Sequence, residues 1–237
     1  DSSTSRGLGD VYKRQQPARR TRRGEIKLNA NAEAAKPEQA IVYIVDDDSS
    51  VRAALEDLLA SVGLRSASFG STMEFLAHKM IDAPGCLVLD IRMPGQSGMD
   101  FHRQMSDLGI QLPTIFITGH GDIAMGVQAM KNGAIEFLTK PFRDQDLLDA
   151  IQHGIEINRV TRAEQAINAQ LQKRWSSLTA GEQQVVQLVV QGLLNKQIAA
   201  ALNLSEVTVK VRRGAAMRKM EAATLADLVK ISEKLKI

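Results

Sequence analysis

The chain has 237 residues, of which 44% are hydrophobic and 24% are charged, and its formal net charge is +3. This composition is typical of one or two globular domains and excludes a wholly disordered chain. No apolar run approaches the ~18 residues of a membrane-spanning helix, and no signal-peptide pattern is visible, so we expect a soluble, cytoplasmic protein without a membrane partner. The chain has a single cysteine, Cys86, which lies in an apolar run. One cysteine can form neither an intrachain disulfide nor a cysteine-based zinc site.

Charge is distributed unevenly along the chain. Residues 1–39 carry a net charge of +4, residues 40–158 a net charge of −8, and residues 159–237 a net charge of +7. An acidic middle followed by a basic segment indicates two modules with different partners, and the basic module is a candidate for binding a polyanion. Two surfaces that differ only in their solvation would produce the same asymmetry.

Residues 1–39 show little apolar periodicity and contain the basic cluster Arg19-Arg20-Thr21-Arg22-Arg23. We expect this segment to be disordered or a non-native extension, and we leave it out of the fold argument. An arm that binds phosphate groups is the alternative interpretation.

Residues 40–158 alternate between short apolar runs and amphipathic stretches. The run from Ile41 to Val45 is continuous, as expected for a strand buried on both faces of a parallel sheet. Stretches such as Val51 to Val62 have apolar residues at helical spacing. Strands that alternate with helices predict one doubly wound α/β domain with a five-stranded parallel sheet. The expected strands are 41–45, 65–69, 86–89, 114–117 and 134–138.

A helical pattern runs without proline from about Asp144 toward Leu171, so a helical linker is expected over residues 159–176. After Trp175 only helical patterns follow, which predicts a small all-α domain at residues 177–237. Its expected helices are 180–191, 195–202, 205–220 and 224–235.

Polar or charged residues follow four of the predicted strands. Ligands of an open parallel sheet bind beyond the carboxyl ends of its strands. Asp46 and two further aspartates follow the first strand, and Asp90 ends the third. Clustered carboxylates repel one another and favour a hard divalent cation, most simply Mg²⁺. The ion would draw in a phosphoryl group, with Asp90 as nucleophile, Thr118 as hydrogen-bond donor and Lys140 as balancing cation.

Two residues near this edge have open roles. Asp48 either replaces a neighbouring aspartate as a metal ligand or caps the next helix, and the end of the apolar run at Val45 favours the cap. His120 lies between two glycines beside Thr118, where it could relay a proton, but an exposed loop histidine is the simpler interpretation.

The segments that carry these residues resemble a two-component response-regulator receiver in order and spacing, and the resemblance covers residues 41–157. It implies a flavodoxin-like fold with Asp90 as the phosphoacceptor. It also implies a Mg²⁺ ion bound by the carboxylates of Asp46, Asp47 and Asp90 and by the backbone carbonyl of Arg92. The segments are Asp46-Asp47-Asp48, Leu89-Asp90-Ile91-Arg92-Met93-Pro94-Gly95, Ile117-Thr118-Gly119-His120-Gly121-Asp122 and Leu138-Thr139-Lys140-Pro141-Phe142.

The same resemblance assigns roles to three further residues. Thr118 contacts the phosphoryl group and Lys140 pairs with it. Phe137 occupies the place of an aromatic switch, which turns inward when the threonine moves, although a core aromatic at the end of a strand would look the same in sequence. The peptide bond between Lys140 and Pro141 matches a cis bond of the family.

The predicted helix 205–220 has two different faces. Ser205 is a good N-cap, and a helical wheel places Val209, Ala216 and Met220 on one face, which should be core. The opposite face combines cations with small or short side chains, as a recognition helix in a DNA major groove does. That face holds Val207, Lys210, Val211, Gly214, Ala215 and Arg218. Arg212, Arg213 and Lys219 lie at the margins of this face and would reach phosphates, as would Lys196. Thr208 is a further expected DNA contact.

Residues 178–236 resemble the LuxR/FixJ-type helix-turn-helix domain, through Leu178-Thr179, Glu182, Asn195 to Ala199 and Ser205 to Met220. The resemblance implies double-stranded promoter DNA as a partner. The chain departs from the family at Arg212, where histidine is frequent, and at Ala180-Gly181. The final helix would pair with its twin in a DNA-bound dimer, or its apolar residues would close the domain's own core. Those residues are Leu225, Leu228, Val229 and Ile231.

Together the two resemblances imply a DNA-binding response regulator rather than a turnover enzyme. A sensor histidine kinase would phosphorylate Asp90, the region of Thr118 and Phe137 would rearrange, and the protein would form a homodimer through its fourth helix and bind a promoter. RNA polymerase is a further candidate partner. A phosphohydrolase with an aspartyl-phosphate intermediate would need a second acid where the chain has Arg92. A protein-interaction domain in place of the DNA-binding domain is the remaining alternative.

Overall fold

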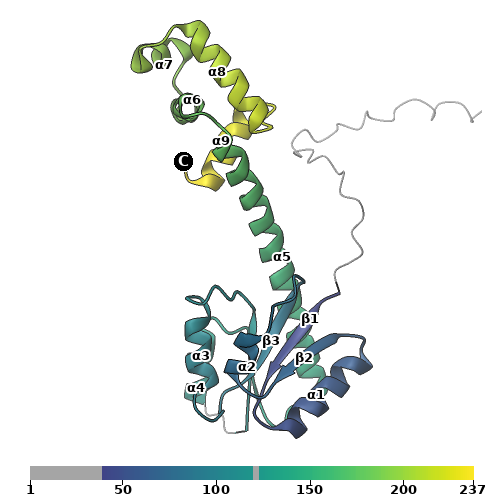
Figure 1. The fold of residues 1–237 in the computed structure, drawn as a ribbon. Coiled ribbons are helices and arrows are strands. Elements are labelled where there is room, and N and C mark those ends of the chain that lie inside the picture. The colour runs from purple at the N-terminus through teal and green to yellow at the C-terminus, as the bar shows by residue number, and fades with distance from the viewer. Residues whose placement is uncertain (1–38, 120–122) are drawn as a thin grey trace, which may run out of the picture. The chain divides into compact units, whose positions relative to one another are not determined.

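The structure is a computed structural model that describes residues 39–119 and 123–237 (Figure 1). The predictions made for residues 1–38 and for His120 concern residues outside these ranges. In chain order, the described part begins with alternating strands and helices and ends with helices only. None of the described helices is long and apolar enough to span a membrane.

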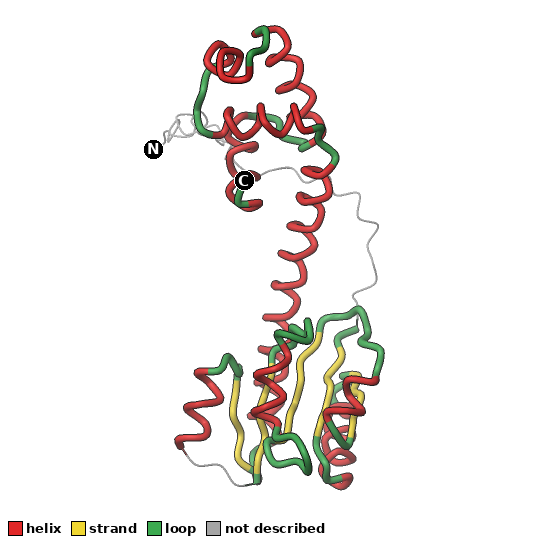
Figure 2. The backbone as a smooth tube through the Cα atoms, turned by 60° about the vertical axis from the view of Figure 1, so that its left-hand side comes forward, coloured by secondary structure: helices red, strands yellow, loops and turns green. Residues whose placement is uncertain are grey.

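Five strands form one parallel sheet in the order β2-β1-β3-β4-β5, drawn in yellow in Figure 2. This confirms the predicted doubly wound fold. The strand order reverses between β1 and β3, so the edge of the sheet beyond the carboxyl ends of these two strands is where a ligand site is expected. The strands are β1 (Ile41–Val45), β2 (Arg65–Phe69), β3 (Gly85–Asp90), β4 (Thr114–Thr118) and β5 (Glu136–Thr139).

Helices cover both faces of this sheet. Side chains along each strand alternate between the two faces, so a buried strand packs against helices on both sides. The first, third and fifth residues of β1 join a hydrophobic cluster with Phe75 of α2 and Phe101 of α3. Its second and fourth residues join another with Leu59 of α1 and Ile151 of α5. The helices are α1 (Ser49–Ser61), α2 (Thr72–Ala77), α3 (Gly98–Met105), α4 (Ile123–Lys131) and α5 (Asp144–Ser176).

Two residues hold α5 close against the sheet. A Cβ atom at Gly154 would lie 2.8 Å from Ile135 Cδ1 and 3.0 Å from Cys86 Cβ, so a larger residue would push the helix away. One turn later, the buried Asn158 accepts a hydrogen bond from the Gly85 N–H at 3.0 Å and donates one to the Gln111 carbonyl at 3.1 Å. These contacts tie α5 to the start of β3 and to the loop before β4.

The C-terminal helices surround a third core, which also includes Trp175 at the end of α5. Val209 and Ala216 of α8 and Met220, its C-cap, are fully buried, which confirms the predicted core face. Ser205 accepts a hydrogen bond from the Thr208 N–H at 3.1 Å and is the predicted N-cap. The helices are α6 (Ala180–Val190), α7 (Asn195–Leu202), α8 (Glu206–Lys219) and α9 (Leu225–Leu235).

The final helix contributes to this core. Leu228 is 1% exposed and Ile231 packs against the same cluster, whereas Leu225 is 39% exposed. Closure of the domain's own core therefore accounts for Leu228 and Ile231 and leaves Leu225 outside it.

The fifth strand begins at Glu136, two residues later than predicted. The N–H of Ala134 donates to the Ala129 carbonyl at the end of α4, and Gly133 has a φ of 92°. Ala134 therefore belongs to the turn out of α4, and its side chain is buried without being part of a strand.

Candidate functional site

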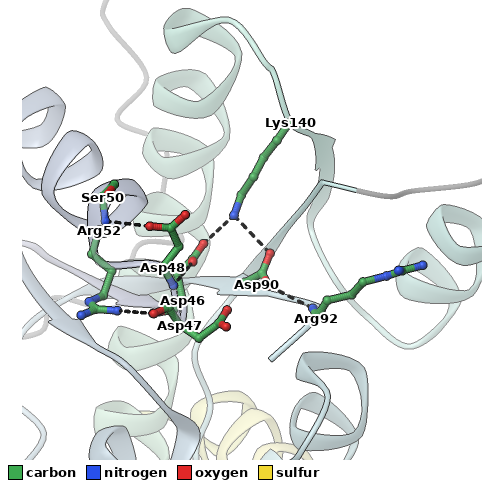
Figure 3. A network of polar contacts seen from close by, with 8 residues as sticks. All are labelled: Asp46, Asp47, Asp48, Ser50, Arg52, Asp90, Arg92 and Lys140. Atoms are coloured by element: carbon green, nitrogen blue, oxygen red, sulfur yellow. Dashed lines mark hydrogen bonds and ion pairs between the residues drawn. The ribbon is translucent and has the colours of Figure 1, made fainter. Parts of the chain in front are cut away.

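Three charged side chains meet at the carboxyl edge of the sheet (Figure 3). The ammonium nitrogen of Lys140 lies 2.6 Å from Asp46 Oδ2 and 3.2 Å from Asp90 Oδ1. The side chains of Asp46 and Asp90 are only 1% and 7% exposed, so two buried acids share one lysine cation. The sequence predicted that these residues share one edge, and the structure brings them into direct contact.

The pairing of the strands produces this convergence. Val45 of β1 lies beside Leu89 of β3, so Asp46 and Asp90 follow as the next residues of neighbouring parallel strands. On the other side of β4, the Lys140 N–H donates to the Thr118 carbonyl at 2.8 Å, immediately after β5 ends. The peptide bond that follows Lys140 is cis, as the family resemblance implied.

The backbone around Asp90 is tightly arranged. Asp90 Oδ2 accepts a hydrogen bond from the Arg92 N–H at 3.0 Å, while the Arg92 side chain is exposed and extends away from Asp90 (Figure 3). A Cβ atom at Gly98, the first residue of α3, would lie 2.1 Å from the Asp90 carbonyl oxygen. Glycine is therefore required there, and sequence reasoning missed it because the contact lies across a loop.

The other two aspartates after β1 differ from Asp46. Asp47 is exposed. Asp48 caps α1 by accepting a hydrogen bond from the Ser50 N–H at 2.8 Å, the favoured of its two predicted roles. That bond lowers the pKa of Asp48. The N–H of Asp48 in turn donates to Asp46 Oδ1 at 2.9 Å, so the cap also orients the buried acid.

Arg52 holds the backbone of this acidic loop, a role that sequence reasoning missed. Its guanidinium donates from Nη1 to the carbonyl oxygens of Asp46 at 2.7 Å and of Asp47 at 3.1 Å (Figure 3). The signal in the sequence is a single cation in the first half of the helix that follows three acids. Only the structure shows that it turns back to the loop.

The two buried acids and the partly buried lysine influence one another. Burial raises the pKa of Asp90, the cation of Lys140 opposes this rise, and the charge of Asp46 adds to it. Burial disfavours the charged form of Lys140, but its hydrogen bond to Asp46 and the charges of both acids outweigh burial and raise its pKa. Lys140 thus remains a cation, and this one cation faces two carboxyl groups at this edge.

The oxygen donors here are of the kind that Mg²⁺ binds. Carboxylate oxygens of Asp46 and Asp90 converge here, and Asp47 and Arg92, the other two predicted ligands, line one hollow nearby. Within the described ranges, no three Asp, Glu, His or Cys side chains are grouped closely enough to enclose a metal by themselves. Magnesium usually keeps several waters and takes one or two carboxylates, so two acids that already converge on one cation fit such an ion.

The two predicted switch residues lie on neighbouring strands. Thr118 is fully buried at the end of β4. Phe137 of β5 lies beside Phe116 of β4 and packs against the cluster on the side of α4. A Cβ atom at Gly126 of α4 would lie 3.3 Å from Phe137 Cδ1, so the half-buried ring rests on that helix. A movement of the ring would therefore change its contact with α4.

The face of α8 opposite its core is exposed. Val207 and Val211 are 72% and 64% exposed, and Lys210 and Arg218 are exposed on the same side. Gly214 leaves a gap in this face, because a Cβ atom there would meet only the end of Arg218, at 3.7 Å. The combination predicted for a recognition helix is therefore present at the surface.

The other predicted DNA contacts are arranged less uniformly. Lys196 is exposed near the start of α7. Thr208 is half-buried, and its hydroxyl is hydrogen-bonded to that of Ser205 at 2.8 Å. Arg213 is half-buried and donates to Asn195 Oδ1 at 3.2 Å. These two residues make contacts within the domain, so only Lys196 of the three is presented without restraint at the surface.

Two further cations of α8 pack against α6. The guanidinium of Arg212 lies over Gly181, where a Cβ atom would be 2.6 Å from Nη1. Lys219 forms an ion pair with Glu182 at 2.7 Å, so the lysine expected to reach phosphates stabilises the domain itself.

Comparison with known proteins identifies both regions. Residues 42–152 match the family described as response regulator receiver domain, and residues 176–232 match bacterial regulatory proteins, luxR family. Nodulation protein W of Bradyrhizobium diazoefficiens is 51% identical over 199 residues, which cover 84% of this chain and 88% of that protein. Response regulator protein TodT of Pseudomonas putida is 46% identical over 197 residues, which cover 83% of this chain and 87% of that protein.

A solved structure and a further relative agree with this. The structure of the response regulator StyR is similar with a TM-score of 0.74 and 49% identity, and the match covers 83% of this chain and 99% of that one. Transcriptional regulatory protein FixJ of Rhizobium meliloti is 40% identical over 191 residues, or 81% of this chain and 94% of FixJ. The chain therefore belongs to the response regulators that join a receiver domain to a luxR-family DNA-binding domain and regulate transcription.

Proposed function

We propose that Asp90 accepts a phosphoryl group from a phosphohistidine of a partner sensor kinase. The observation that carries this proposal is the orientation of its carboxylate, with Oδ1 facing the Lys140 ammonium and Oδ2 accepting the Arg92 N–H. A carboxylate oxygen of Asp90 attacks phosphorus, and the phosphorus–nitrogen bond of the phosphohistidine breaks. The electron pair of that bond goes to the imidazole nitrogen, and an acyl phosphate is left on Asp90.

The neighbouring residues would support this transfer in different ways. Asp46, Asp47, Asp90 and the Arg92 carbonyl would hold Mg²⁺, which supplies positive charge to the phosphoryl oxygens when bound. Lys140 would balance charge on the phosphoryl group, because it already lies within 3.2 Å of Asp90. The Thr118 hydroxyl would donate a hydrogen bond to a phosphoryl oxygen. The chain would then be the acceptor of the group rather than an enzyme with an external substrate.

The signal would pass from this edge to α4. Movement of Thr118 toward the phosphoryl group would let the Phe137 ring shift, and that ring rests on Gly126. The helix α4 also presents exposed apolar side chains, with Ile123 at 88% and Val127 at 48%. An exposed apolar face of this kind favours association, so phosphorylation would promote a homodimer through α4.

The exposed face of α8 would bind the major groove of promoter DNA. Lys210 and Arg218 would contact phosphates or base edges, and Lys196 of α7 would contact a phosphate. Binding of this kind weakens with salt, by about −0.9 in log–log slope for each phosphate neutralised.

The first test is phosphate uptake from a labelled small phosphodonor in the presence of Mg²⁺. The parent should acquire a label that hydroxylamine removes, as an acyl phosphate requires, and Asp90→Asn should acquire none. Asp57→Asn, which changes an exposed aspartate of α1 in the same way, should be labelled like the parent. Labelling of Asp90→Asn at the parent level would disprove the assignment.

The second test is DNA affinity as a function of salt. Lys210→Ala should weaken binding and reduce the salt slope by about one phosphate contact. Lys234→Ala, which removes an exposed lysine of α9, serves as the matched control and should bind like the parent. If Lys210→Ala binds every duplex as the parent does, α8 is not the DNA-contacting helix.

A further inference from the structure

We propose that Val207 and Val211 read the 5-methyl groups of thymines, and that they give this protein a preference for two thymines in each half-site. The inference rests on the proposed contact between α8 and DNA and adds to it the chemical group that the helix recognises.

The two valines form one continuous apolar strip. In the described C-terminal domain, Val207 is the most exposed of the large apolar side chains, at 72%, and Val211 follows it by one turn at 64%. A single exposed valine needs no explanation, but two on one face of a helix that is otherwise polar or small on that side form a surface with a chemical preference.

In the first turn of α8, Val207 is the side chain that can contact a base edge. The hydroxyls of Ser205 and Thr208 are hydrogen-bonded to each other at the cap. Glu206 lines a separate hollow together with Asn195. Residues at the N-terminal end of a recognition helix contact base edges, and the apolar group on those edges in the major groove is the thymine methyl.

The surroundings of the strip match the charge and shape of the groove. Lys210 lies between the valines in sequence and is exposed on the same side, so an anionic backbone is attracted to this face. Gly214, one turn beyond Lys210, adds no side chain that would hold the helix away from the bases. An apolar strip beside a cation and a gap fits a DNA groove better than it fits an apolar protein partner.

The spacing of the valines predicts the spacing of the thymines. Four residues of α-helix advance about 6 Å, at about 1.5 Å per residue. Base pairs are about 3.4 Å apart along each strand, so two methyl groups about two steps apart would lie under the two side chains.

The test uses the full chain with Mg²⁺ and beryllofluoride, and a duplex selected by this protein from a random-sequence pool. Each thymine of that duplex is replaced singly by deoxyuridine, which lacks only the methyl group. Two replacements, about two steps apart, should each weaken binding roughly threefold to tenfold, as expected for one lost methyl contact. Val207→Ser should weaken binding to the thymine duplex by a similar factor but should not weaken binding further when its own thymine is already deoxyuridine.

Val62→Ser is the matched control, because Val62 is 51% exposed and lies in the receiver domain. It should bind both duplexes like the parent. The inference fails if the selected duplex has no thymine at such positions, if no deoxyuridine matters, or if Val207→Ser weakens both duplexes equally. Should Lys210→Ala still weaken binding in those cases, the proposed contact of α8 with DNA stands without the thymine preference. Parent-like binding by Lys210→Ala contradicts both.

Discussion

The guanidinium of Arg212 in α8 fills the space beside Gly181 in α6. A Cβ atom at residue 181 would lie 2.6 Å from Arg212 Nη1 and 2.8 Å from Cζ. Along the sequence, Arg212 and Gly181 are two separate departures from the LuxR/FixJ resemblance. In the structure they form one arrangement, because the glycine leaves the room that the arginine occupies.

This arrangement predicts that Gly181→Ala displaces the arginine without unfolding the domain. The free energy of unfolding should change by less than about 1 kcal/mol, because an arginine tip moves readily and alanine is favoured over glycine in a helix. Arg212→Ala should then change DNA affinity less in the Gly181→Ala background than in the parent. A double-mutant cycle measured by fluorescence anisotropy tests this, and equal effects in both backgrounds would show that the two residues are not coupled.

The bridge of Lys140 predicts a stability that depends on divalent cations. Lys140→Gln should lower the free energy of unfolding of the receiver domain by about 1–3 kcal/mol without Mg²⁺, since it leaves two buried acids without their shared cation. Added Mg²⁺ should restore more stability in this variant than in the parent. Thermal unfolding followed by circular dichroism, with and without a chelator, measures both quantities.

The control for that experiment is Lys79→Gln, which removes an exposed lysine after α2. It should show the same response to Mg²⁺ as the parent. An equal gain from Mg²⁺ in the Lys140→Gln variant and the parent would mean that the lysine does not compensate the acids.

The contacts of Arg52 predict that removing its side chain weakens Mg²⁺ binding. Arg52→Met should weaken Mg²⁺ binding roughly tenfold, because the carbonyls of Asp46 and Asp47 lose the group that orients their loop. Loss of a positive charge alone would have the opposite effect and strengthen cation binding. Isothermal titration calorimetry distinguishes the two, with Arg65→Met, an exposed arginine of β2, as the control for charge. Tighter Mg²⁺ binding by Arg52→Met would exclude the positioning role.

The ion pair of Glu182 predicts how the C-terminal domain responds to acid. The hydrogen bond from Lys219, followed by that from the Thr179 N–H, lowers the pKa of Glu182 below its usual 4.5. A group with a lowered folded-state pKa stabilises the fold above its unfolded pKa, and this contribution disappears as the pH falls through the folded value. The domain should therefore lose stability progressively below about pH 4.5.

Glu182→Gln tests this, because glutamine can still accept the Thr179 N–H but carries no charge. The substitution should lower the free energy of unfolding by about 1–2 kcal/mol at neutral pH. The free energy of unfolding of the variant should then fall less steeply than that of the parent as the pH is lowered. Trp175 is the chain's single tryptophan and lies in the C-terminal core, so its fluorescence reports unfolding of this domain. Parallel pH curves for parent and variant would contradict the prediction.

The sequence by itself determined the features that depend on near neighbours. A continuous apolar run located β1 to the residue, and a weaker pattern over Arg65–Phe69 located β2. The caps at Asp48 and Ser205 followed from short polar side chains before an apolar period. The wheel of α8 separated its buried face from its exposed face. These rules act over one to four residues, which is why they can be applied without coordinates. The same rules misplaced the start of β5, because an apolar Ala134 is buried equally well in a turn.

Only the tertiary structure decided which distant residues touch. Lys140 and Asp46 are 94 positions apart, and their contact depends on the order of four strands in the sheet. The return of Arg52 to the acidic loop and the place of Arg212 beside Gly181 likewise have no periodic signature. Their partners are set by how whole elements pack, and packing is a property of the complete sheet and helix cluster rather than of any short stretch of chain.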